Sequence, residues 1–424
     1  MAALVDDDPA KANVAVNGVE VRGRVADLGA VAARCRASTV VVAVPSASSP
    51  LLAAVADLAE RAGLEMLVAP SLTELRAPGP SVSPSAVRPP TVADLMGRHQ
   101  VVTDVDLAAG YLTGRRVLVT GAGGSIGSEL ARRVAAYDPA VLVLADRDET
   151  TLLRTVSGVP DAVLEVFDVR DRAGVDAVFA AHRPEVVFHA AALKHVPVLE
   201  ACPAEAALTN VGGTIHVAEA AAAVGAALVN ISTDKAAAPV SVLGASKALA
   251  ERAVAAVADS TGTAAVSVRF GNVAGSRGSV IEVWAAQIAA GGPLTVTDPD
   301  ATRYLMTVGE AVELVVHAGA HAADGGVLVL DVGAPVRVGD LADRMMALAG
   351  RTVPVRVTGL RPGEKTHEAL WAPDETVTAG PHPLIRRVAV SGALPAVDAL
   401  VADRDPARVR DRLLSLAAAA ACRR

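Results

Sequence analysis

Residues 116–146 read RVLVTGAGGSIGSELARRVAAYDPAVLVLAD. An apolar run that predicts a strand breaks into Gly121, Gly124 and Gly127, and a helical pattern follows at once. Gly121 suits a tight turn, Gly124 the close approach of a pyrophosphate, and Gly127 the packing of helix on strand. The helix amino terminus adds free N–H groups and the positive end of a dipole. This stretch therefore predicts a dinucleotide-binding strand–turn–helix unit.

Further residues are expected to face the dinucleotide. Asp146 lies 19 residues after Gly127, about where a carboxylate meets the adenosine ribose. A carboxylate accepts from the 2′-hydroxyl and repels a 2′-phosphate, which predicts NAD as the cofactor. Arg147 could receive that phosphate, so NADP stays an alternative. The other residues predicted to bind the cofactor are Ser125, Ile126, Asp168, Val169, Ala190, Ala191, Ala192 and Lys247.

The bulk composition limits the classes of protein that this chain can be. Its 424 residues suffice for two or three domains. Although 52% of them are hydrophobic, no run of about 18 uncharged apolar residues predicts a membrane span, and the amino terminus lacks an export signal. The three scattered cysteines favour a reducing cytoplasm and argue against a metal site or disulfides. A net charge of −7 and few aromatic residues argue against nucleic-acid binding.

Hydrophobic patterns divide the chain into four segments. Residues 1–76 predict a small Rossmann-like α/β domain, in which the β-branched run 39–44 suits a strand buried on both faces. Residues 77–113 predict a proline- and serine-rich linker followed by a lead-in with a short helix. Residues 114–395 predict the dinucleotide-binding domain, with a smaller substrate lobe mainly after residue 270. Residues 396–424 predict a helical tail.

Strands and helices alternate through the third segment. Strands are expected at 116–119, 141–145, 163–167, 186–190, 228–232 and 265–270, with helices between them at 125–136, 171–181, 205–223 and 246–258. Repeated alternation of apolar strands with helices predicts the α/β class and a doubly wound parallel sheet. Ligands of such sheets gather at the carboxyl ends of the strands, so polar residues at these ends are the candidates for the site.

One strand end carries residue types that point to proton chemistry. Thr233, Asp234 and Lys235 follow directly on the strand that ends at residue 232. On the next helix, Lys247 could hold a ribose, and its charge favours ionisation of nearby hydroxyls. The spacing is that of a Tyr-x-x-x-Lys pair, but Leu243 occupies the tyrosine position. The usual phenolate base of short-chain dehydrogenases is therefore absent.

An adjacent acid and base suit the removal of a proton and the expulsion of a hydroxyl. A lysine acts as a base when neutral and a carboxyl acts as an acid when protonated, and burial favours both of these forms. Lys194 and His195 follow the preceding strand end, where they are expected to meet a diphosphate or a sugar. The sequence therefore predicts a lyase-type reaction rather than a simple oxidation.

Seven motifs in order carry a resemblance to a known family. They are TGAGGSIGSEL, HAAALKHVP, ISTDKA, GASK, RFGNVAGSRGSV, TVTDPDATRYLMT and TGLRPGEK. Their succession resembles that of the nucleotide-sugar 4,6-dehydratases of the capsular polysaccharide biosynthesis type, which are extended short-chain dehydrogenases. The amino-terminal segment is similar to the extra Rossmann-like domain of the long members, where membrane-spanning helices precede it. The chain is expected to be a soluble or truncated version of these members, and a homo-oligomer.

The resemblance implies an NAD-dependent dehydration of a UDP-N-acetylhexosamine, with UDP-GlcNAc as the first expectation. It implies that Lys235 takes the C5 proton, Asp234 protonates the departing C6 hydroxyl, Thr233 serves the C4 hydroxyl and Lys247 positions the cofactor. Arginine forks suit the two phosphates of UDP. The residues expected to bind the substrate are Lys194, His195, Asn272, Arg277, Arg303, Arg361 and Glu364.

Two other functions stay open at the level of sequence. A C5-inverting dehydratase or a nucleotide-sugar epimerase would pass through the same C4 ketone and differ only in how protons return. A non-catalytic NAD(H)-binding regulatory protein would fit the missing tyrosine. No single residue settles the first of these, although the Thr233–Lys235 cluster favours dehydration.

Overall fold

The computed structural model describes residues 1–44, 49–69, 87–88, 105–331, 333–390, 392, 395–403 and 405–419. The chain forms two compact units. Unit 1 combines residues 1–100 with 280–296 and 338–357, and unit 2 comprises 101–279, 297–337 and 358–424. All residues of the predicted site lie in unit 2. The domain boundaries expected from the sequence stay a prediction, and the linker expected at 77–90 lies outside the described residues except for residues 87–88.

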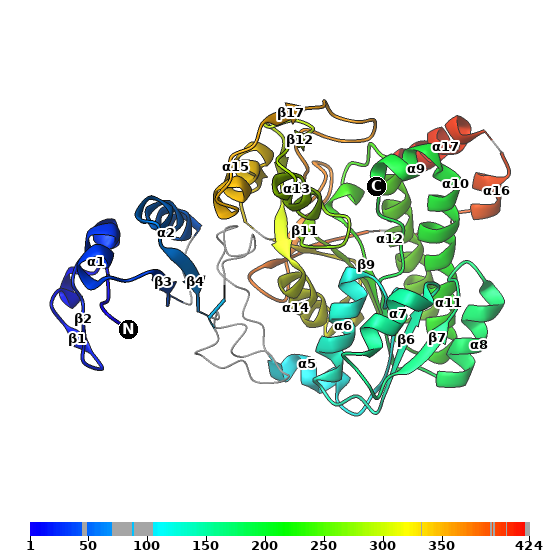
Figure 1. The fold of residues 1–424 in the computed structure, drawn as a ribbon. Helices are drawn as coiled ribbons and strands as arrows, with labels where there is room; N and C mark the ends of the chain where they lie inside the picture. Colours follow the sequence, from blue (N-terminus) through cyan, green and yellow to red (C-terminus); the bar gives the residue numbers. More distant parts are fainter. Residues whose placement is uncertain are drawn as a thin grey trace. The chain divides into compact units, whose positions relative to one another are not determined.

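Unit 2 is built on a nine-stranded sheet in the order β18-β19-β15-β10-β9-β8-β5-β6-β7 (Figure 1). The strands are β5 Arg116–Thr120, β6 Val141–Asp146, β7 Val163–Val166, β8 Val186–His189, β9 Ala227–Ile231, β10 Ala265–Arg269, β15 Val327–Leu330, β18 Val377–Ala379 and β19 Ile385–Val388. The seven strands from β7 to β15 are parallel, and β19 and β18 add an antiparallel edge. The chain winds outward from β5 in both directions, which confirms the doubly wound parallel sheet.

Helices cover both faces of this sheet. The helical segments of unit 2 are α5 Val105–Leu112, α6 Ser125–Ala135, α7 Glu149–Val156, α8 Arg172–His182, α9 Val196–Ala201, α10 Pro203–Ala206, η3 Ala207–Gly212, α11 Gly213–Val224, η4 Asp234–Ala236, α12 Val242–Thr261, α14 Val308–Gly319, η5 Ala322–Asp324, α16 Val397–Val401 and α17 Pro406–Ala419. The helix expected over 205–223 is divided, because η3 is a π-helical stretch between α10 and α11. The widened turn buries Asn210 fully, a detail that hydrophobic periodicity does not encode.

The central strands separate two apolar layers. Val117 and Val119 of β5 pack with α5, α6 and α14 on one face, whereas Leu118 packs with α8, α11 and α12 on the other. Because side chains alternate along a strand, a run that is apolar at every position is buried on both faces. This explains why the core strands read as continuous apolar segments in the sequence.

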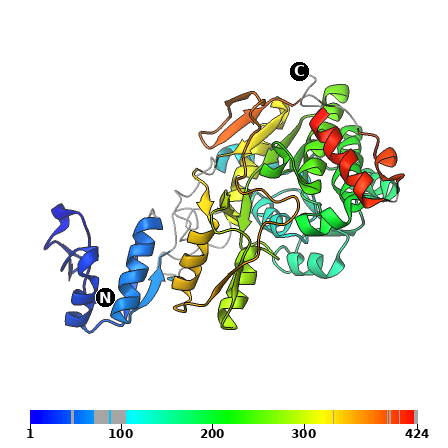
Figure 2. The same cartoon turned by 90° about the horizontal axis from the view of Figure 1, so that it is seen from above.

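The last helix of unit 2, α17, packs against α12. In Figure 2, α17 is the red helix, and its Val409 and Leu413 pack in one cluster with Leu243 and Leu249 of α12. Arg252 of α12 donates to the carbonyls at the end of α17, at 3.0 Å and 2.6 Å. The guanidinium therefore caps unpaired helix carbonyls, and α17 is fixed to the helix that carries Lys247.

Two small sheets complete unit 2. The parallel pair is β11 Asn272–Ala274 with β14 Leu305–Thr307, and the antiparallel pair is β13 Thr302–Arg303 with β16 Val336–Arg337. They place Asn272 and Arg303, two of the residues expected to bind the substrate, beyond the ends of the main strands. After residue 270, these short strands lie outside the main sheet, whereas β15 continues it in parallel beside β10.

Unit 1 contains three two-stranded sheets. Its elements are η1 Pro9–Lys11, β1 Ala15–Val16, β2 Val19–Glu20, η2 Val25–Asp27, α1 Leu28–Cys35, β3 Thr39–Val42, α2 Ser49–Ala62, β4 Glu65–Val68, α13 Val280–Ala289, β12 Leu294–Val296, α15 Val338–Leu348 and β17 Val355–Val357. The expectation that β3 is buried on both faces is wrong, because Val41 is 44% exposed. Val40 and Val42 face the helices α1 and α2, and Val41 points to the opposite face. Across the described parts of both units, no helix has the length and apolar character needed to cross a bilayer.

Candidate active site

The glycine-rich loop between β5 and α6 is shaped by close backbone contacts. Gly121 has φ +69°, and a Cβ at this position would lie 2.5 Å from the amide nitrogen of Ala191. A Cβ on Gly127 would overlap the carbonyl oxygen of Gly121. Gly124 is the N-cap of α6. The glycines therefore let the loop lie against the end of β8 and leave the first N–H groups of α6 open to an anion.

A cleft opens at the carboxyl ends of β5, β6, β7 and β8. It is lined by Thr120, Gly121, Gly124, Ala145, Asp146, Arg147, Phe167, Asp168, Val169, Ala190, Ala191, Ala192, Leu193 and Thr209. Most of the predicted cofactor residues thus come together around one cleft. Four do not line it: Ser125, Ile126, Gly127 and Lys247. Thr120 and Thr209, which the sequence analysis missed, add hydroxyls to its wall.

Asp146 organises the loop from the end of β6. Its Oδ2 accepts from the amide nitrogen of Gly123 at 2.9 Å, and its Oδ1 accepts from Asp148 N at 3.0 Å. Each carboxylate oxygen keeps a second lone pair for a further donor. The carboxylate can therefore hold the glycine loop and accept from a ribose hydroxyl at the same time.

Asp168 neutralises arginines beside the cleft. Its Oδ2 lies 2.7 Å from Arg170 Nη2 and 3.5 Å from Arg147 Nη1. Burial would raise the pKa of Asp168, but hydrogen bonds from Arg170 and the charges of Arg170 and Arg147 outweigh it and hold the pKa below its usual range. Since Arg147 already pairs with this carboxylate, its charge is less available to a 2′-phosphate.

His189 lies beneath the cleft and was not singled out from the sequence. Its Nδ1 is 2.8 Å from Thr120 Oγ1, and its Nε2 is 3.0 Å from Thr214 Oγ1. Thr214 Oγ1 already donates its proton to Asn210 O. Nε2 must therefore donate to Thr214, and Nδ1 accepts from Thr120. Burial, followed by the charge of Lys247, lowers the pKa of His189 to about 3, so the ring is neutral.

This buried histidine predicts an acid-sensitive fold. The unfolded chain protonates His189 near pH 6.5, whereas the folded chain resists protonation down to about pH 3. The contribution of neutral His189 to the free energy of unfolding is therefore complete above about pH 6.5. It falls by about 4 kcal/mol as the pH drops toward 3. Urea unfolding at a series of pH values should show a steeper acid loss for the wild type than for His189→Gln. Equal slopes for the two proteins would contradict this assignment.

Thr233, Asp234 and Lys235 form a hydrogen-bonded cluster after β9. Lys235 Nζ donates to Asp234 Oδ1 at 3.0 Å and to Asn272 Oδ1 at 2.8 Å. Thr233 Oγ1 donates to Asp234 Oδ1 at 3.0 Å. Asp234 is fully buried, and its Oδ2 has no hydrogen-bond partner among the described residues. The amide nitrogen of Asp234 donates to Phe270 O at 2.9 Å, which fixes the cluster to the end of β10.

Two residues of α12 define the neighbouring wall. Lys247 is 5% exposed, and burial lowers its pKa to about 8 although the charge of Glu251 opposes this shift. Leu243 is buried in an apolar cluster with Leu199 of α9 and Val242. The position where the sequence pattern would place a phenol is therefore part of the core.

Lys194, His195 and Arg277 gather at the glycine loop. Lys194 Nζ donates to Arg277 O at 2.9 Å, and Arg277 N donates to Ser125 Oγ at 3.0 Å. The Arg277 guanidinium donates to the carbonyl of Gly123. A Cβ on Gly278 would lie 3.0 Å from His195 Cε1, so His195 borders the same segment. These residues were expected at the substrate, and the structure places them beside the predicted pyrophosphate loop.

Arg303, Arg361 and Glu364 form a second group. Arg303 Nη1 donates to Thr366 O at 2.9 Å, and Glu364 Oε2 accepts from Arg361 N at 2.9 Å. From the same loop, Lys365 Nζ donates to Ala237 O at 3.2 Å, just after η4. The TGLRPGEK loop is thus fastened beside the Thr233–Lys235 cluster, while the side chain of Arg361 is exposed.

The sequence of this chain is similar to those of known proteins. Residues 117–390 match the family described as "Polysaccharide biosynthesis protein". The capsular polysaccharide biosynthesis protein CapD of Staphylococcus aureus is 38% identical over 384 residues, which cover 88% of this chain and 64% of that protein. The chain thus spans less than two thirds of the length of this curated relative.

Solved structures share the fold of a large part of the chain. Pen from Bacillus thuringiensis matches with a TM-score of 0.62 and 31% identity, covering 67% of this chain and 93% of its own. UDP-glucose 4-epimerase of Thermus thermophilus, solved in complex with NAD, matches with a TM-score of 0.54 and 27% identity, covering 60% of this chain and 89% of its own.

Proposed function

The chain belongs to the polysaccharide biosynthesis protein family, and from this premise we propose that it is an NAD-dependent enzyme that removes water from a UDP-N-acetylhexosamine. The first candidate substrate is UDP-GlcNAc, and the product is a UDP-4-keto-6-deoxy sugar for polysaccharide or glycan synthesis. The family resemblance carried by the seven motifs is confirmed by this membership. The NAD complex of the similar epimerase supports the cofactor, and the similar capsular polysaccharide protein supports the pathway class.

One observation carries the proposal. At the end of β9, Lys235 Nζ lies 3.0 Å from a fully buried carboxyl whose second oxygen has no partner among the described residues. Moving a proton along this hydrogen bond turns the ion pair into a neutral amine and a protonated carboxyl. These are the forms that a general base and a general acid need. Dehydration requires both in one site, because one proton leaves carbon while another joins the departing oxygen.

The glycine loop and its surroundings fit a dinucleotide. The loop offers a cradle that a Cβ at Gly121 would disrupt, and Asp146 has lone pairs left for a ribose. Lys194 adds a positive charge beside this loop, where its Nζ donates to Arg277 O. A nicotinamide held here would supply reversible hydride transfer between C4 and C6 of the sugar, with no net oxidation.

The side chains of the cluster then divide the proton transfers. Lys235 Nζ takes the C5 proton, which the C4 ketone acidifies, and Asn272 Oδ1 holds this amine in place at 2.8 Å. Asp234 gives its proton to the C6 hydroxyl, which leaves as water. Lys235 Nζ returns a proton to C5 as hydride is added at C6, so the sugar loses one H and one OH in total and the atoms balance. Such general acid–base help is typically worth roughly 10²- to 10⁴-fold in rate.

We assign Thr233 and Lys247 to the first step, the oxidation of the C4 hydroxyl to a ketone. Leu243 supplies no phenol, so the hydroxyl of Thr233 relays the C4 hydroxyl proton to water, while its hydrogen bond to Asp234 at 3.0 Å holds the hydroxyl in place. Lys247 orients the cofactor ribose, and its charge favours ionisation of hydroxyls close to it. Full turnover by a Thr233→Val variant would remove Thr233 from this role.

The decisive experiment is mass spectrometry of UDP-GlcNAc incubated with the purified protein, without and with added NAD. The expected result is a product lighter by one water. NAD release on denaturation of the protein would show that the cofactor is retained. An unchanged sugar in both conditions, and with other UDP-N-acetylhexosamines, would exclude this dehydratase and leave a binding protein.

A second candidate is a nucleotide-sugar epimerase, which the similarity to UDP-glucose 4-epimerase favours. It would use the same C4 ketone without expelling the C6 hydroxyl. In that case the incubation would give an isomer of unchanged mass, separable by chromatography. The buried carboxyl beside Lys235 favours dehydration, because an epimerase has no leaving hydroxyl to protonate.

A further inference from the structure

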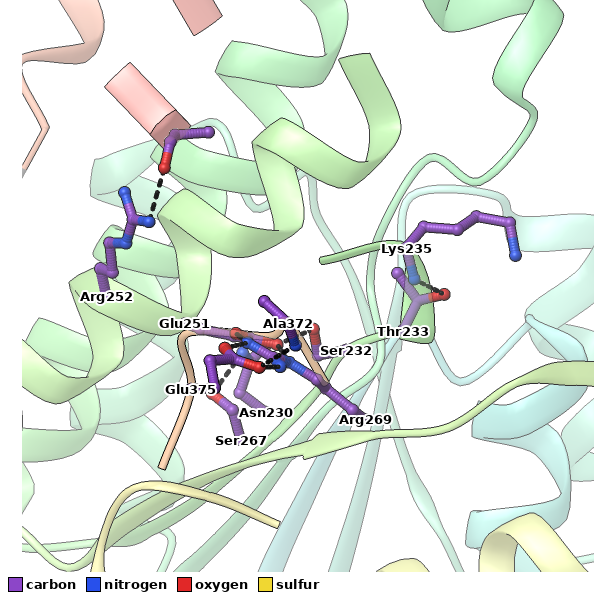
Figure 3. A network of polar contacts seen from close by, with 11 residues as sticks. Asn230, Ser232, Thr233, Lys235, Glu251, Arg252, Ser267, Arg269, Ala372 and Glu375 are labelled. Carbon is purple, nitrogen blue, oxygen red and sulfur yellow. Dashed lines mark hydrogen bonds and ion pairs between the residues drawn. The ribbon is translucent and has the colours of Figure 1, made fainter. Parts of the chain in front are cut away.

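A buried network of charges lies directly behind the Thr233–Lys235 cluster. Arg269 of β10 pairs with Glu251 of α12 at 2.6 Å and with Glu375 at 2.8 Å. The arginine side chain is 3% exposed, and the two glutamates are 1% and 9% exposed. Figure 3 shows both carboxylates converging on the guanidinium. The network therefore joins three segments that are far apart in the sequence.

Glu251 is the member that contacts the catalytic strand end. Its Oε1 accepts from Ser232 Oγ at 2.5 Å and from Arg269 Nε at 2.8 Å. Ser232 precedes Thr233, and its amide nitrogen donates to Val268 O at 2.7 Å. Side-chain and backbone contacts thus fix the residue from which Thr233, Asp234 and Lys235 continue. Figure 3 shows Ser232 at the network, with Thr233 and Lys235 beside it.

Stability alone does not account for this network. A buried ion pair gives about as much stability as apolar side chains of the same volume, because desolvation offsets the attraction. Although burial opposes its charge, the carboxylates of Glu251 and Glu375 raise the pKa of Arg269 above its ordinary value. One fixed cation against two carboxylates leaves one negative charge in excess. Glu251, which carries one of these two carboxylates, lies one helical turn from Lys247 on α12.

We propose that Glu251 is a positioning residue of the reaction: bound to Arg269 and Ser232, it holds the strand end that carries Thr233, Asp234 and Lys235 and keeps Lys247 protonated. The inference rests on the proposed function. Through its hydrogen bond to Glu251, Ser232 fixes the backbone that leads into Thr233. The negative charge of Glu251 stabilises the protonated form of Lys247. Glu375 holds the other side of Arg269 and accepts from Ala372 N at 2.8 Å, which ties the segment after the TGLRPGEK loop to the same centre.

The charged groups around Lys247 agree with this role. On its own helix, Glu251 is the carboxylate that opposes deprotonation. At the end of β8, His189 interacts with Lys247, but its ring is neutral. On η4, which packs against α12, Asp234 and Lys235 pair with each other at 3.0 Å. Burial lowers the pKa of Lys247, and the charge of Glu251 raises it. Removing this charge should therefore lower the pKa of Lys247 further.

The test is the Glu251→Gln variant, which keeps the size and a hydrogen-bond acceptor for Ser232 but removes the charge. In the wild type, the alkaline limb of the kcat–pH profile is expected near pH 8, where Lys247 loses its proton. In the variant, this limb should move down by about one pH unit or more, as expected for loss of an opposite charge. KM for the UDP-sugar should stay within about threefold. Glu251→Asp, which keeps the charge, should restore the limb.

The matched control is Glu313→Gln. Glu313 of α14 forms a buried pair with Arg133 of α6 at 2.7 Å, with side chains 8% and 9% exposed. Both glutamine variants should lower Tm, but only Glu251→Gln should move the pH limb. An unmoved limb in Glu251→Gln, or an equal shift in Glu313→Gln, would overturn the proposal.

An NMR titration separates this proposal from the proposed function. Lysine labelled with ¹³C at Cε reports the protonation of Lys247 without turnover, with Lys247→Arg used to assign its signal. A lower midpoint for Lys247 in Glu251→Gln supports the proposal, even if no UDP-sugar is dehydrated. An unchanged midpoint overturns it, even if the wild type is an active dehydratase.

Discussion

Lys235→Ala is expected to lower kcat for the proposed dehydration by roughly 10²- to 10⁴-fold, because the proposed base for the C5 proton is lost. The side chain lies between Asp234 Oδ1 and Asn272 Oδ1, at 3.0 Å and 2.8 Å, and is 18% exposed. Deuterium from heavy water should enter the sugar at C5 with the wild type and not with the variant. Mass spectrometry of the recovered UDP-sugar measures both effects.

Lys235→Arg is the matched control for the charge. A guanidinium keeps the positive charge beside Asp234, but it does not lose its proton in a protein and cannot act as a base. The arginine variant should therefore be as inactive as Lys235→Ala. If Lys235 served only as the ion-pair partner of Asp234, Lys235→Arg would retain most of the activity, and the assignment of the base would be wrong.

Gly121→Ala is expected to abolish cofactor retention and, with it, turnover. The new Cβ would lie 2.5 Å from Ala191 N and 2.6 Å from Ala190 C, both of which are backbone atoms that cannot rotate away. The loop or the end of β8 must shift, and a displacement of about 1 Å can cost roughly 10²-fold in a site of this kind. Isothermal titration with NAD measures the loss of affinity.

Gly262→Ala separates this overlap from backbone strain. Gly262 ends α12 with φ +72°, close to the value of +69° at Gly121, but a Cβ there would meet nothing within 4 Å. Both variants carry the cost of a left-handed alanine, about 1 kcal/mol. Only Gly121→Ala should lose NAD. Equal NAD affinity in both variants would show that the loop does not hold the dinucleotide as proposed.

The alternation of apolar strands and helices was enough to predict the main sheet. Each of the six strands expected in the third segment is found within one or two residues of its predicted bounds, for instance Val141–Asp146 against 141–145. Such strands are apolar at every position because helices cover both faces, and this signal is local in the sequence. The prediction that β3 is buried on both faces was wrong, because β-branched residues also occur in strands that helices cover on one face only.

The candidate site was predictable where its residues are adjacent in sequence. Thr233, Asp234 and Lys235 are neighbours at a strand end, and the structure finds them hydrogen-bonded to one another. Arg277 was expected at the substrate, but its guanidinium contacts the carbonyl of Gly123, 154 residues away in the chain. A lone arginine in a loop carries no signal for such a contact.

By itself, the sequence determined the doubly wound sheet, the glycine loop and the adjacent Asp234 and Lys235 at a strand end, because each depends on residues within one or two neighbouring elements. Only the tertiary structure decided that His189 is a neutral buried bridge and that Glu251 and Glu375 share Arg269. Glu375 and Arg269 are 106 residues apart in the chain. Their pairing depends on which strands and helices become neighbours, and charge pairing across such a separation leaves no local pattern in the sequence.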